Sequence, residues 1–559
     1  MLRFFETIPG MLAWGTIAGL IGGAYFFPRT IGIFVVLFDV YWFLKSVYLA
    51  IHMRTAFSKM GENLKVDWRA ELEKLGNDGN NNNNDNDSRR HSHGLSSVPH
   101  WRNVRHLVIF PMYREPYEVV RESFASLSKT TYPKEKIFVV LATEERADLP
   151  AGASAKAGEA ARRIAQEFGG CFGKLLVTVH PSGLPGEIPG KGSNIAWAAR
   201  RAKEELLDPL FRAKNENEHE DAHSHSPEWC YRNILVSAFD IDTQAPPDYF
   251  ARLTHAFLTA KDPLRAIYQP IPLFTNNIYQ APLLARVVAF SATFWQMMQQ
   301  ARPERLTTFS SQSVPLPVLE DVGFWDRSVV SEDSRIFWQA YLRYGGDFRV
   351  EPLHFPVMMD ANVAPTFWGT MRNVYLQQRR WGWGVENVPY VLSGFFQSKA
   401  IRLPNIRQSD CLNIVPREKK LYWTFNMLEG FHSWATNVLI IFFLGWLPTL
   451  IGGAEFRTTL LSYSIPSVTR ILMFVAMISV VTAATLSVSL LPPRPVWFRR
   501  RHMTLFLLEW WCMPFTLILF GAIPALEAQT RLMLGGKYRL GFWVTPKTRD
   551  MGYGMLNME

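Results

Sequence analysis

The chain has 559 residues, of which 48% are hydrophobic, 14% aromatic and only 19% charged, with a formal net charge of +10. This composition excludes a disordered, collagen-like or coiled-coil chain, and the four cysteines lie too far apart for a disulfide framework or a paired-thiolate zinc site. Many of the basic residues flank apolar segments, so we expect them to face anionic lipid headgroups and expect no nucleic-acid partner.

Two apolar segments begin the chain. Residues 11–27 and 31–52 each approach the ~20 residues that a helix needs to cross a ~30 Å hydrocarbon layer. They predict an N-terminal transmembrane hairpin over residues 1–52. The polar stretch 53–100 follows, with a run of asparagines and no hydrophobic periodicity, and it predicts a disordered linker.

Residues 101–400 alternate short apolar runs with stretches long enough for crossover helices, which predicts an α/β sheet domain. The runs that we interpret as buried strands are residues 104–110, 136–142, 174–180 and 233–240. In such sheets ligands bind beyond the carboxyl ends of the strands, so the chemistry is expected there.

Apolar segments return after residue 400, at about 434–452, 470–491 and 504–526. The last two are joined by an arginine-rich loop, which the positive-inside rule places in the cytosol together with the sheet domain. Glu509 and Pro514 interrupt the final run and predict a broken, re-entrant or interfacial helix that returns the C-terminus to the cytosol.

These features divide the C-terminal part of the chain into three expected regions. We expect interfacial helices over residues 401–430 and a transmembrane or re-entrant region over 431–530. A cytosolic tail would follow over 531–559.

Asp240-Ile241-Asp242 follows directly on an expected strand. Two carboxylates one residue apart at a strand end can converge on one hard divalent cation that also binds diphosphate oxygens. Taken alone, such a pair more often forms a turn or a helix cap.

Two later motifs also have two interpretations. Ser331-Glu332-Asp333 could supply a general base, or it could start a helix. Residues 377–381, Gln-Gln-Arg-Arg-Trp, place a fixed cation beside a flat indole, or they form a solvated basic face.

The order of the motifs decides between these interpretations. Asp-x-Asp, then Ser-Glu-Asp, then Gln-x-x-Arg-Trp, all between two sets of apolar helices, resembles the membrane-integrated family 2 glycosyltransferases, which include cellulose, hyaluronan and chitin synthases. The resemblance implies a GT-A-like (Rossmann-like) cytosolic α/β domain over residues 101–400 with α-helical transmembrane segments.

Three further segments agree with this family. Residues 111–116 resemble its nucleotide-contacting segment, and residues 190–194 resemble its lysine and asparagine turn. Residues 542–547, Phe-Trp-Val-Thr-Pro-Lys, are similar to the gating loop of bacterial cellulose synthase. The sequence departs from the family at the end of the second strand, where an aspartate normally binds uracil and Glu144 or Glu145 would substitute.

The resemblance implies a role for each of these residues. Asp333 and Glu332 would form the catalytic pair, with Asp333 as the base. The donor-binding residues would be Tyr113, Glu115, Glu144, Lys191, Asp240, Asp242, Arg380 and Lys547. Asp240 and Asp242 would also bind Mg²⁺ or Mn²⁺, and Gln377 and Trp381 would bind the acceptor.

The implied reaction is inverting transfer of a sugar from a nucleotide-sugar, most readily a UDP-sugar, to a growing polysaccharide, with processive synthesis and chain export. The alternative is a single transfer to a lipid acceptor, as in ceramide glucosyltransferases. A catalytically inactive scaffold or transporter is a third hypothesis, which the complete acidic set disfavours. The protein would be an integral multi-pass protein in contact with membrane lipid, and the plasma membrane is favoured over internal membranes.

Overall fold

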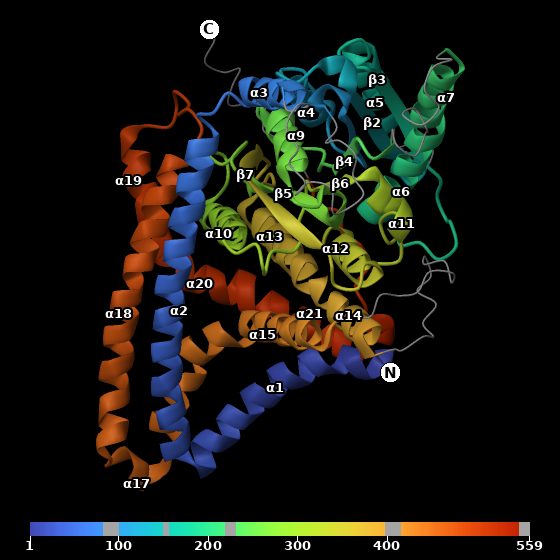
Figure 1. Cartoon of the computed structure of the whole chain (residues 1–559). Coiled ribbons are helices and arrows are strands. Elements are labelled where there is room, and N and C mark those ends of the chain that lie inside the picture. The colour runs from blue at the N-terminus through green and yellow to red at the C-terminus, as the bar shows by residue number, and fades with distance from the viewer. Residues whose placement is uncertain (82–99, 149–155, 218–230, 397–414, 547–559) are drawn as a thin grey trace.

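The computed structural model describes residues 1–81, 100–148, 156–217, 231–396 and 415–546 (Figure 1). A sheet domain, with helices on both faces of its sheet, stands beside long apolar helices, and several helices lie between these two parts (Figure 1).

Seven strands form one mixed sheet in the order β3-β2-β1-β4-β6-β5-β7. Their bounds are β1 Arg105–Pro111, β2 Ile137–Glu144, β3 Lys174–His180, β4 Ile234–Ala238, β5 Ala266–Leu273, β6 Ser313–Pro315 and β7 Arg349–Met358. Strands β1 to β4 pair in parallel, β6 runs antiparallel to β4 and β5, and β5 pairs in parallel with β7. The four strands expected from the sequence are present, and the α/β fold class is confirmed.

Helices cover both faces of the sheet and close two apolar cores. The helices of this part are α4 Tyr117–Leu127, α5 Lys156–Phe168, α6 Lys191–Ala202, α7 Asp208–Asn217, α9 Tyr249–Thr259, α11 Leu316–Val322 and α12 Glu332–Arg343. Ile195 and Phe337 belong to one core, and Phe124 and Phe250 belong to the other. Because β1, β2 and β4 are buried on both faces, their sequences are continuous apolar runs.

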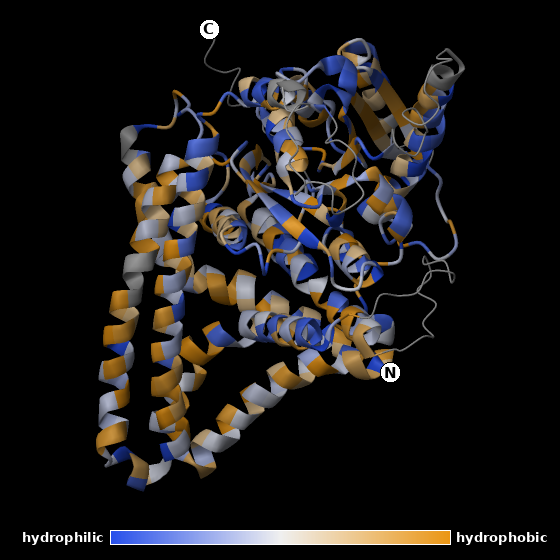
Figure 2. Cartoon of the chain, viewed as in Figure 1, coloured by the Kyte–Doolittle hydropathy of each residue, from blue (hydrophilic) through white to orange (hydrophobic). Residues whose placement is uncertain are grey.

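Four helices are long and apolar enough to cross a membrane, by length and composition. They cover Leu2–Phe26 (α1), Pro28–Asn63 (α2), Leu460–Ser489 (α18) and His502–Leu534. Figure 2 shows that hydrophobic residues dominate α2 and α18, which run side by side. Large side chains on α18, among them Leu460 and Phe474, are exposed, as contact with lipid requires.

Most of the remaining helices lie under or beside the sheet domain, whereas α17 lies at the far end of α2 and α18 (Figure 1). They are α3 Trp68–Asn81, α10 Leu283–Gln300, α13 Phe367–Gly382, α14 Asn387–Phe396, α15 Arg417–Phe442, α16 Leu447–Ile451, α17 Gly453–Arg457, α19 Arg500–Leu508, α20 Met513–Leu517 and α21 Ile523–Leu534. Helices α15 and α16 form a bent pair with an angle of 46°. Helix α15 is continuous across residue 430, where the sequence placed a boundary.

The expectation of a disordered linker is wrong for residues 53–81. Helix α2 continues to Asn63, whose side-chain amide donates to the His354 carbonyl at 3.0 Å. Helix α3 follows and buries Trp68 and Leu72 against the sheet domain. The short amphipathic helix α3 was not recognised in the sequence because a run of asparagines follows it. Residues 82–99 lie outside the described part of the chain.

The last of the four long helices, His502–Leu534, is helical throughout but changes helix type along its length. Helix α19 ends before Glu509, whose carboxylate pairs with Arg286 of α10, and a tight turn of helix leads into α20. A π-helical segment, Ile518–Ala522, separates α20 from α21, and α21 packs against α1 and α13. The chain therefore returns to the sheet domain after residue 534, and residues 547–559 lie outside the described part.

Candidate active site

One lysine joins three carboxylates at the carboxyl ends of the parallel strands. The Lys191 ammonium lies 2.6 Å from Asp240 Oδ1, 2.9 Å from both carboxylate oxygens of Asp333 and 4.0 Å from Glu332 Oε1. Only 10% of the Lys191 side chain is exposed. We call these four residues the Lys191 cluster.

The backbone brings the Lys191 cluster together from three elements. Lys191 is the first residue of α6, Asp240 lies two residues beyond β4, and Glu332 and Asp333 form the first turn of α12. Carboxylates in the first turn of a helix are stabilised by its dipole. A Cβ atom at Gly192 would lie 2.9 Å from the Glu332 Cβ, so glycine allows α6 and α12 to approach this closely.

Burial sets the charges in the Lys191 cluster. Burial, with a contribution from Asp333, raises the pKa of Glu332 to about 8. Burial also raises the pKa of Asp333, and Lys191 opposes that rise. Burial alone would lower the pKa of Lys191, but the carboxylates of Asp240, Asp333 and Glu332 outweigh it and hold this pKa above its usual range. At neutral pH, Lys191 is therefore charged and Glu332 retains a proton.

Asp242 is fully buried and is held from a second side by the segment that follows β7. Its Oδ2 accepts a hydrogen bond from the Asp360 backbone N–H at 2.9 Å. The Asn276 side-chain amide donates to the Asp242 carbonyl at 3.0 Å and to Asp360 Oδ1 at 3.1 Å. Asp360 and Asn276 belong to no motif recognised in the sequence, although Asp360 follows a buried strand.

The residues present fit a divalent cation shared with a substrate. No group of three or more histidine, cysteine, aspartate or glutamate side chains that could hold a metal is found within the described ranges. Asp240 and Asp242 could supply two hard oxygen ligands, because their carboxylates lie one residue apart just beyond β4. Mg²⁺ is commonly held by one or two carboxylates with substrate phosphates and water completing its shell, so two carboxylates suffice.

The Gln-x-x-Arg-Trp motif lies on α13, and its Arg380 lies near Glu332 and Asp333 of the Lys191 cluster. Arg380 opposes the rise in the pKa values of Glu332 and Asp333 through its charge, and its Nε is buried with no hydrogen-bond partner among the described residues. Trp381 packs against Phe309, with ring centroids 5.5 Å apart. Gln377 lies one turn earlier on α13 and is partly buried.

The segment after α21 covers part of this site. The Arg380 guanidinium lies 4.8 Å from the centroid of the Phe542 ring. A Cβ atom at Gly190 would lie 2.5 Å from the same ring, so Phe542 rests directly on the start of α6. Lys547, expected to contact the donor, lies outside the described residues.

Three of the expected donor-binding residues form a second group at the ends of β1 and β2. The Tyr113 N–H donates to the Glu115 carboxylate at 2.7 Å, and the Arg146 guanidinium lies 4.5 Å from the Tyr113 ring centroid. Glu144 is buried and pairs with Arg146. Glu145 instead accepts from the N–H and hydroxyl of Ser182, both at 2.8 Å. Because β1 lies between β2 and β4, this group is one strand away from Asp240.

Glu386 holds the segment before Glu332 and Asp333 in place and was not recognised in the sequence. Its carboxylate accepts from the N–H of Val330 at 3.0 Å, from the N–H and hydroxyl of Ser331 at 2.8 and 2.7 Å, and from the Trp383 indole at 2.9 Å. These bonds fix the chain that leads into Glu332. The only sequence signal was an acidic residue shortly after the Gln-x-x-Arg-Trp motif.

None of the protein-family models matches the chain, and no curated protein matches it. Among solved structures, the mannosyltransferase PcManGT from Pyrobaculum calidifontis in complex with GDP-Man and Mn²⁺ is 12% identical, with a TM-score of 0.38 over 86% of this chain and 99% of that one. TarS 1-349 from S. aureus in complex with UDP-GlcNAc is 13% identical, with a TM-score of 0.30 over 78% of this chain and 93% of that one. Because these TM-scores are below 0.5, the likeness to these structures carries no argument about function.

Proposed function

We propose that the chain is an inverting, membrane-integrated family 2 glycosyltransferase with a GT-A-like domain over residues 101–400. The observation that carries this proposal is the convergence of the Lys191 cluster and Arg380 at the carboxyl ends of the parallel strands. Two cations and several carboxylates in one place suit a reaction in which a diphosphate leaves and a hydroxyl group loses a proton.

Lys191 and Arg380 are the groups proposed to hold the donor diphosphate. Lys191 is bound to Asp240 and Asp333, so donor phosphates must compete with these carboxylates for its ammonium group. The buried Nε of Arg380 can donate a charge-assisted hydrogen bond to a phosphate oxygen. Asp240 and Asp242 would hold Mg²⁺ or Mn²⁺, which when bound offsets charge on the departing diphosphate.

The nucleotide itself is assigned to the group at the ends of β1 and β2. Tyr113 presents a ring and Glu144 a buried carboxylate beside Arg146, while Glu115 fixes the Tyr113 backbone. A UDP-sugar is the preferred donor. Lys547 is proposed to close over the bound nucleotide, since Phe542 brings its segment to the start of α6.

Asp333 is the proposed general base. It is 24% exposed at the side chain, whereas Glu332 is 4% exposed, so Asp333 is the carboxylate that an acceptor hydroxyl can reach. Asp333 would take the proton as the hydroxyl oxygen attacks the anomeric carbon opposite the leaving diphosphate, which inverts the configuration. Glu332, with its raised pKa, remains protonated beside it.

For the acceptor we propose a growing polysaccharide that is extended processively and exported, with a single transfer to a glycolipid or lipid as the second candidate. The first is favoured because Trp381 offers an indole beside Arg380 and the gating-like segment rests on the site, with Gln377 one turn away on α13. The second is favoured by the exposed apolar side chains of the long helices, since a lipid acceptor would share the same bilayer.

The proposed location is a membrane, with the sheet domain in the cytosol where nucleotide-sugars are made available, and the plasma membrane favoured. This proposal is supported by the four long apolar helices and by the arginines that follow α18.

A donor screen tests the proposed activity. The full chain in lipid nanodiscs would be incubated with each UDP- and GDP-sugar, with Mg²⁺ or Mn²⁺, and nucleotide release would be measured. We expect one sugar to give release that chelation by EDTA abolishes. Absence of release with every donor and both ions would refute the proposal.

Product size separates the two acceptor classes. With the active donor in radiolabelled form, a polysaccharide synthase gives high-molecular-weight product that grows with time. A lipid glycosyltransferase gives one product that migrates as a glycolipid and whose amount, rather than length, increases.

A further inference from the structure

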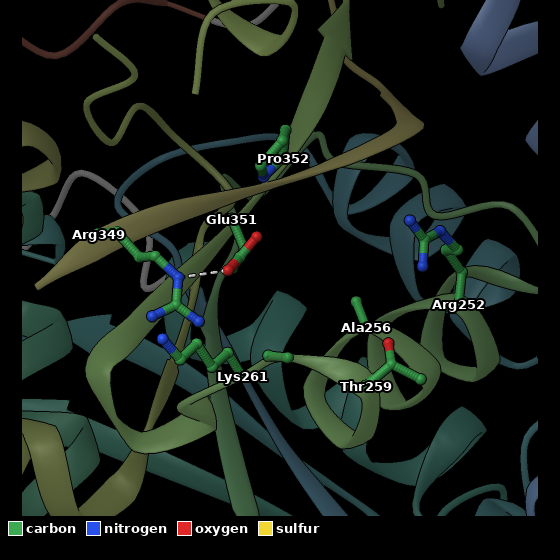
Figure 3. A pocket seen from close by; sticks show the side chains of 8 residues that line it. Arg252, Ala256, Thr259, Lys261, Arg349, Glu351 and Pro352 are labelled. Carbon is green, nitrogen blue, oxygen red and sulfur yellow. Dashed lines mark hydrogen bonds and ion pairs between the residues drawn. The ribbon is translucent and has the colours of Figure 1, made fainter. Parts of the chain in front are cut away.

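A pocket lies between α9 and the first residues of β7, away from the Lys191 cluster (Figure 3). Its volume is about 420 Å³, and it is lined by Arg252, Lys261, Arg349 and Glu351 among others. Strand β7 leads from this pocket at Arg349 to the Asp360 end, where Asp242 is held. The pocket and the proposed active site therefore lie at opposite ends of one strand.

The pocket carries an excess of positive charge. Glu351 pairs with Arg349, which leaves Arg252 and Lys261 with no carboxylate partner among the described residues. Figure 3 shows the Lys261 ammonium and the Arg349 guanidinium directed toward one another. Arg349 Nη2 is buried and makes no hydrogen bond within the described chain. Like charges that converge in this way repel unless an anion lies between them.

Arg252 is held in place on the other side of the pocket. Its Nε donates to the Leu353 carbonyl at 3.2 Å, and its guanidinium lies 4.5 Å from the Trp68 ring centroid. Burial lowers the pKa of Arg252 to about 10, and no described carboxylate offsets that effect. After burial, the charges of Lys59 and Arg252 lower the pKa of the nearby His354, and Arg252 also lowers the pKa of His255, where Glu71 acts in the opposite direction.

A buried or half-buried cation without a counter-charge is unfavourable, and an anion of matching shape removes that cost. Guanidinium groups match phosphate oxygens with two parallel N–H donors, and an ammonium adds a compact charge. A pocket of this volume is within the range that takes a nucleotide-sized ligand.

We propose that this pocket binds a small phosphate-bearing anion between Arg252, Lys261 and Arg349. The site is separate from the donor site, so the inference does not depend on the proposed function. Two sources share this chemistry: a free phosphate or diphosphate compound, and a phosphorylated lipid headgroup.

Calorimetric titration of the full chain in phosphatidylcholine nanodiscs with pyrophosphate, in EDTA, tests the proposal. Lys261→Gln is expected to weaken pyrophosphate binding about tenfold, as loss of one charge-assisted hydrogen bond implies, and Arg252→Gln is expected to weaken it at least as much. The exposed Lys174 provides a matched control, because Lys174→Gln removes the same charge from β3 and should leave the affinity unchanged.

Lys191→Gln distinguishes the pocket from the proposed donor site. We expect this variant to retain the pyrophosphate binding that Lys261→Gln weakens. The proposal is overturned if wild-type protein binds no pyrophosphate, or if Lys191→Gln abolishes binding while Lys261→Gln leaves it intact. Lys261 is exposed, so its substitution tests the pocket even if Arg252→Gln, which loses a packed side chain, fails to fold.

Nanodiscs that contain phosphatidylinositol 4-phosphate identify the source of the anion. If the headgroup enters the pocket, the apparent affinity for pyrophosphate falls in these nanodiscs, and Lys261→Gln removes the difference. If a free anion is the ligand, pyrophosphate binds equally well in both kinds of nanodisc.

Discussion

The two ends of β7 have opposite electrostatics. Beyond its carboxyl end, the carboxylates of the Lys191 cluster surround one lysine, and burial raises the pKa of Glu332. At its beginning, three cations face one carboxylate, and burial lowers the pKa of Arg252. An added cation would therefore stabilise the charges at one edge of the sheet, and an added anion would stabilise those at the opposite edge. The first region is built from sequence motifs, and the second is not.

The largest effect is expected for the proposed base. Asp333→Asn keeps the shape of the side chain but removes the proton acceptor, so sugar transfer should fall by about 10² to 10⁴. Nucleotide release in nanodiscs measures this loss. Asp347→Asn, an exposed substitution of the same kind, should have no effect, and an Asp333→Asn variant with near wild-type rate would assign the base elsewhere.

A smaller effect is expected for the hydrogen bonds of Asn276, which lie beyond the carboxyl end of β7. Asn276→Ala removes the amide that joins the Asp242 carbonyl to Asp360, and the metal concentration for half-maximal activity should rise about 10- to 100-fold. The rate at saturating Mn²⁺ should change little. Asn426→Ala on α15 serves as the control, and a fall in the saturating rate with an unchanged metal requirement would contradict the positioning role.

Gly192→Ala tests how tightly the Lys191 cluster is packed. The new methyl group would meet the Glu332 Cβ at 2.9 Å and the Asp326 carbonyl at 3.1 Å, so α6 and α12 must separate. Overpacking of this kind costs about 1–3 kcal/mol, and the melting temperature should fall. Gly183→Ala is not a suitable control because its φ is positive, whereas Gly170→Ala meets no atom and should be neutral by the same measurement.

The smallest effect concerns the pH dependence of stability. Because the pKa of Glu332 is raised from 4.5 to about 8 on folding, the folded state holds a proton that the unfolded state has lost, and stability falls as the pH rises through this interval. Glu332→Gln removes that contribution, so its melting temperature should fall less than that of wild type between pH 6 and pH 8. If the melting temperatures of the two proteins changed with pH by the same amount, Glu332 would be ionised in the folded protein.

The sequence predicted the parts of the molecule that have a simple local signal. Continuous apolar runs identified β1 to β4, and Lys191, Asp240, Glu332, Asp333 and Arg380 come from motifs whose side chains the fold brings together. Strand β5 was missed because Pro270 and Pro272 interrupt its apolar pattern. Strand β7 was missed for a similar reason, with charged residues and prolines along its length.

Other features depend on contacts between distant segments. Asn276, Asp360 and Glu386 act through hydrogen bonds to residues far away in the chain, which spacing does not reveal. The helical nature of residues 53–81 was missed because Trp68 and Leu72 find their apolar partners only in the folded sheet domain. The pocket at the start of β7 joins Arg252 to Arg349, which no local pattern relates.

Helix α2 has a mechanical consequence for any acceptor. It runs without a break from Pro28 to Asn63, and its last residue is bonded to the His354 carbonyl of β7. In the proposed membrane arrangement, this single continuous helix would connect the bilayer to the rim of the sheet and would set the height of the proposed active site above the lipid surface. The proposed acceptor would then have to reach an active site whose distance from the lipid is set by α2.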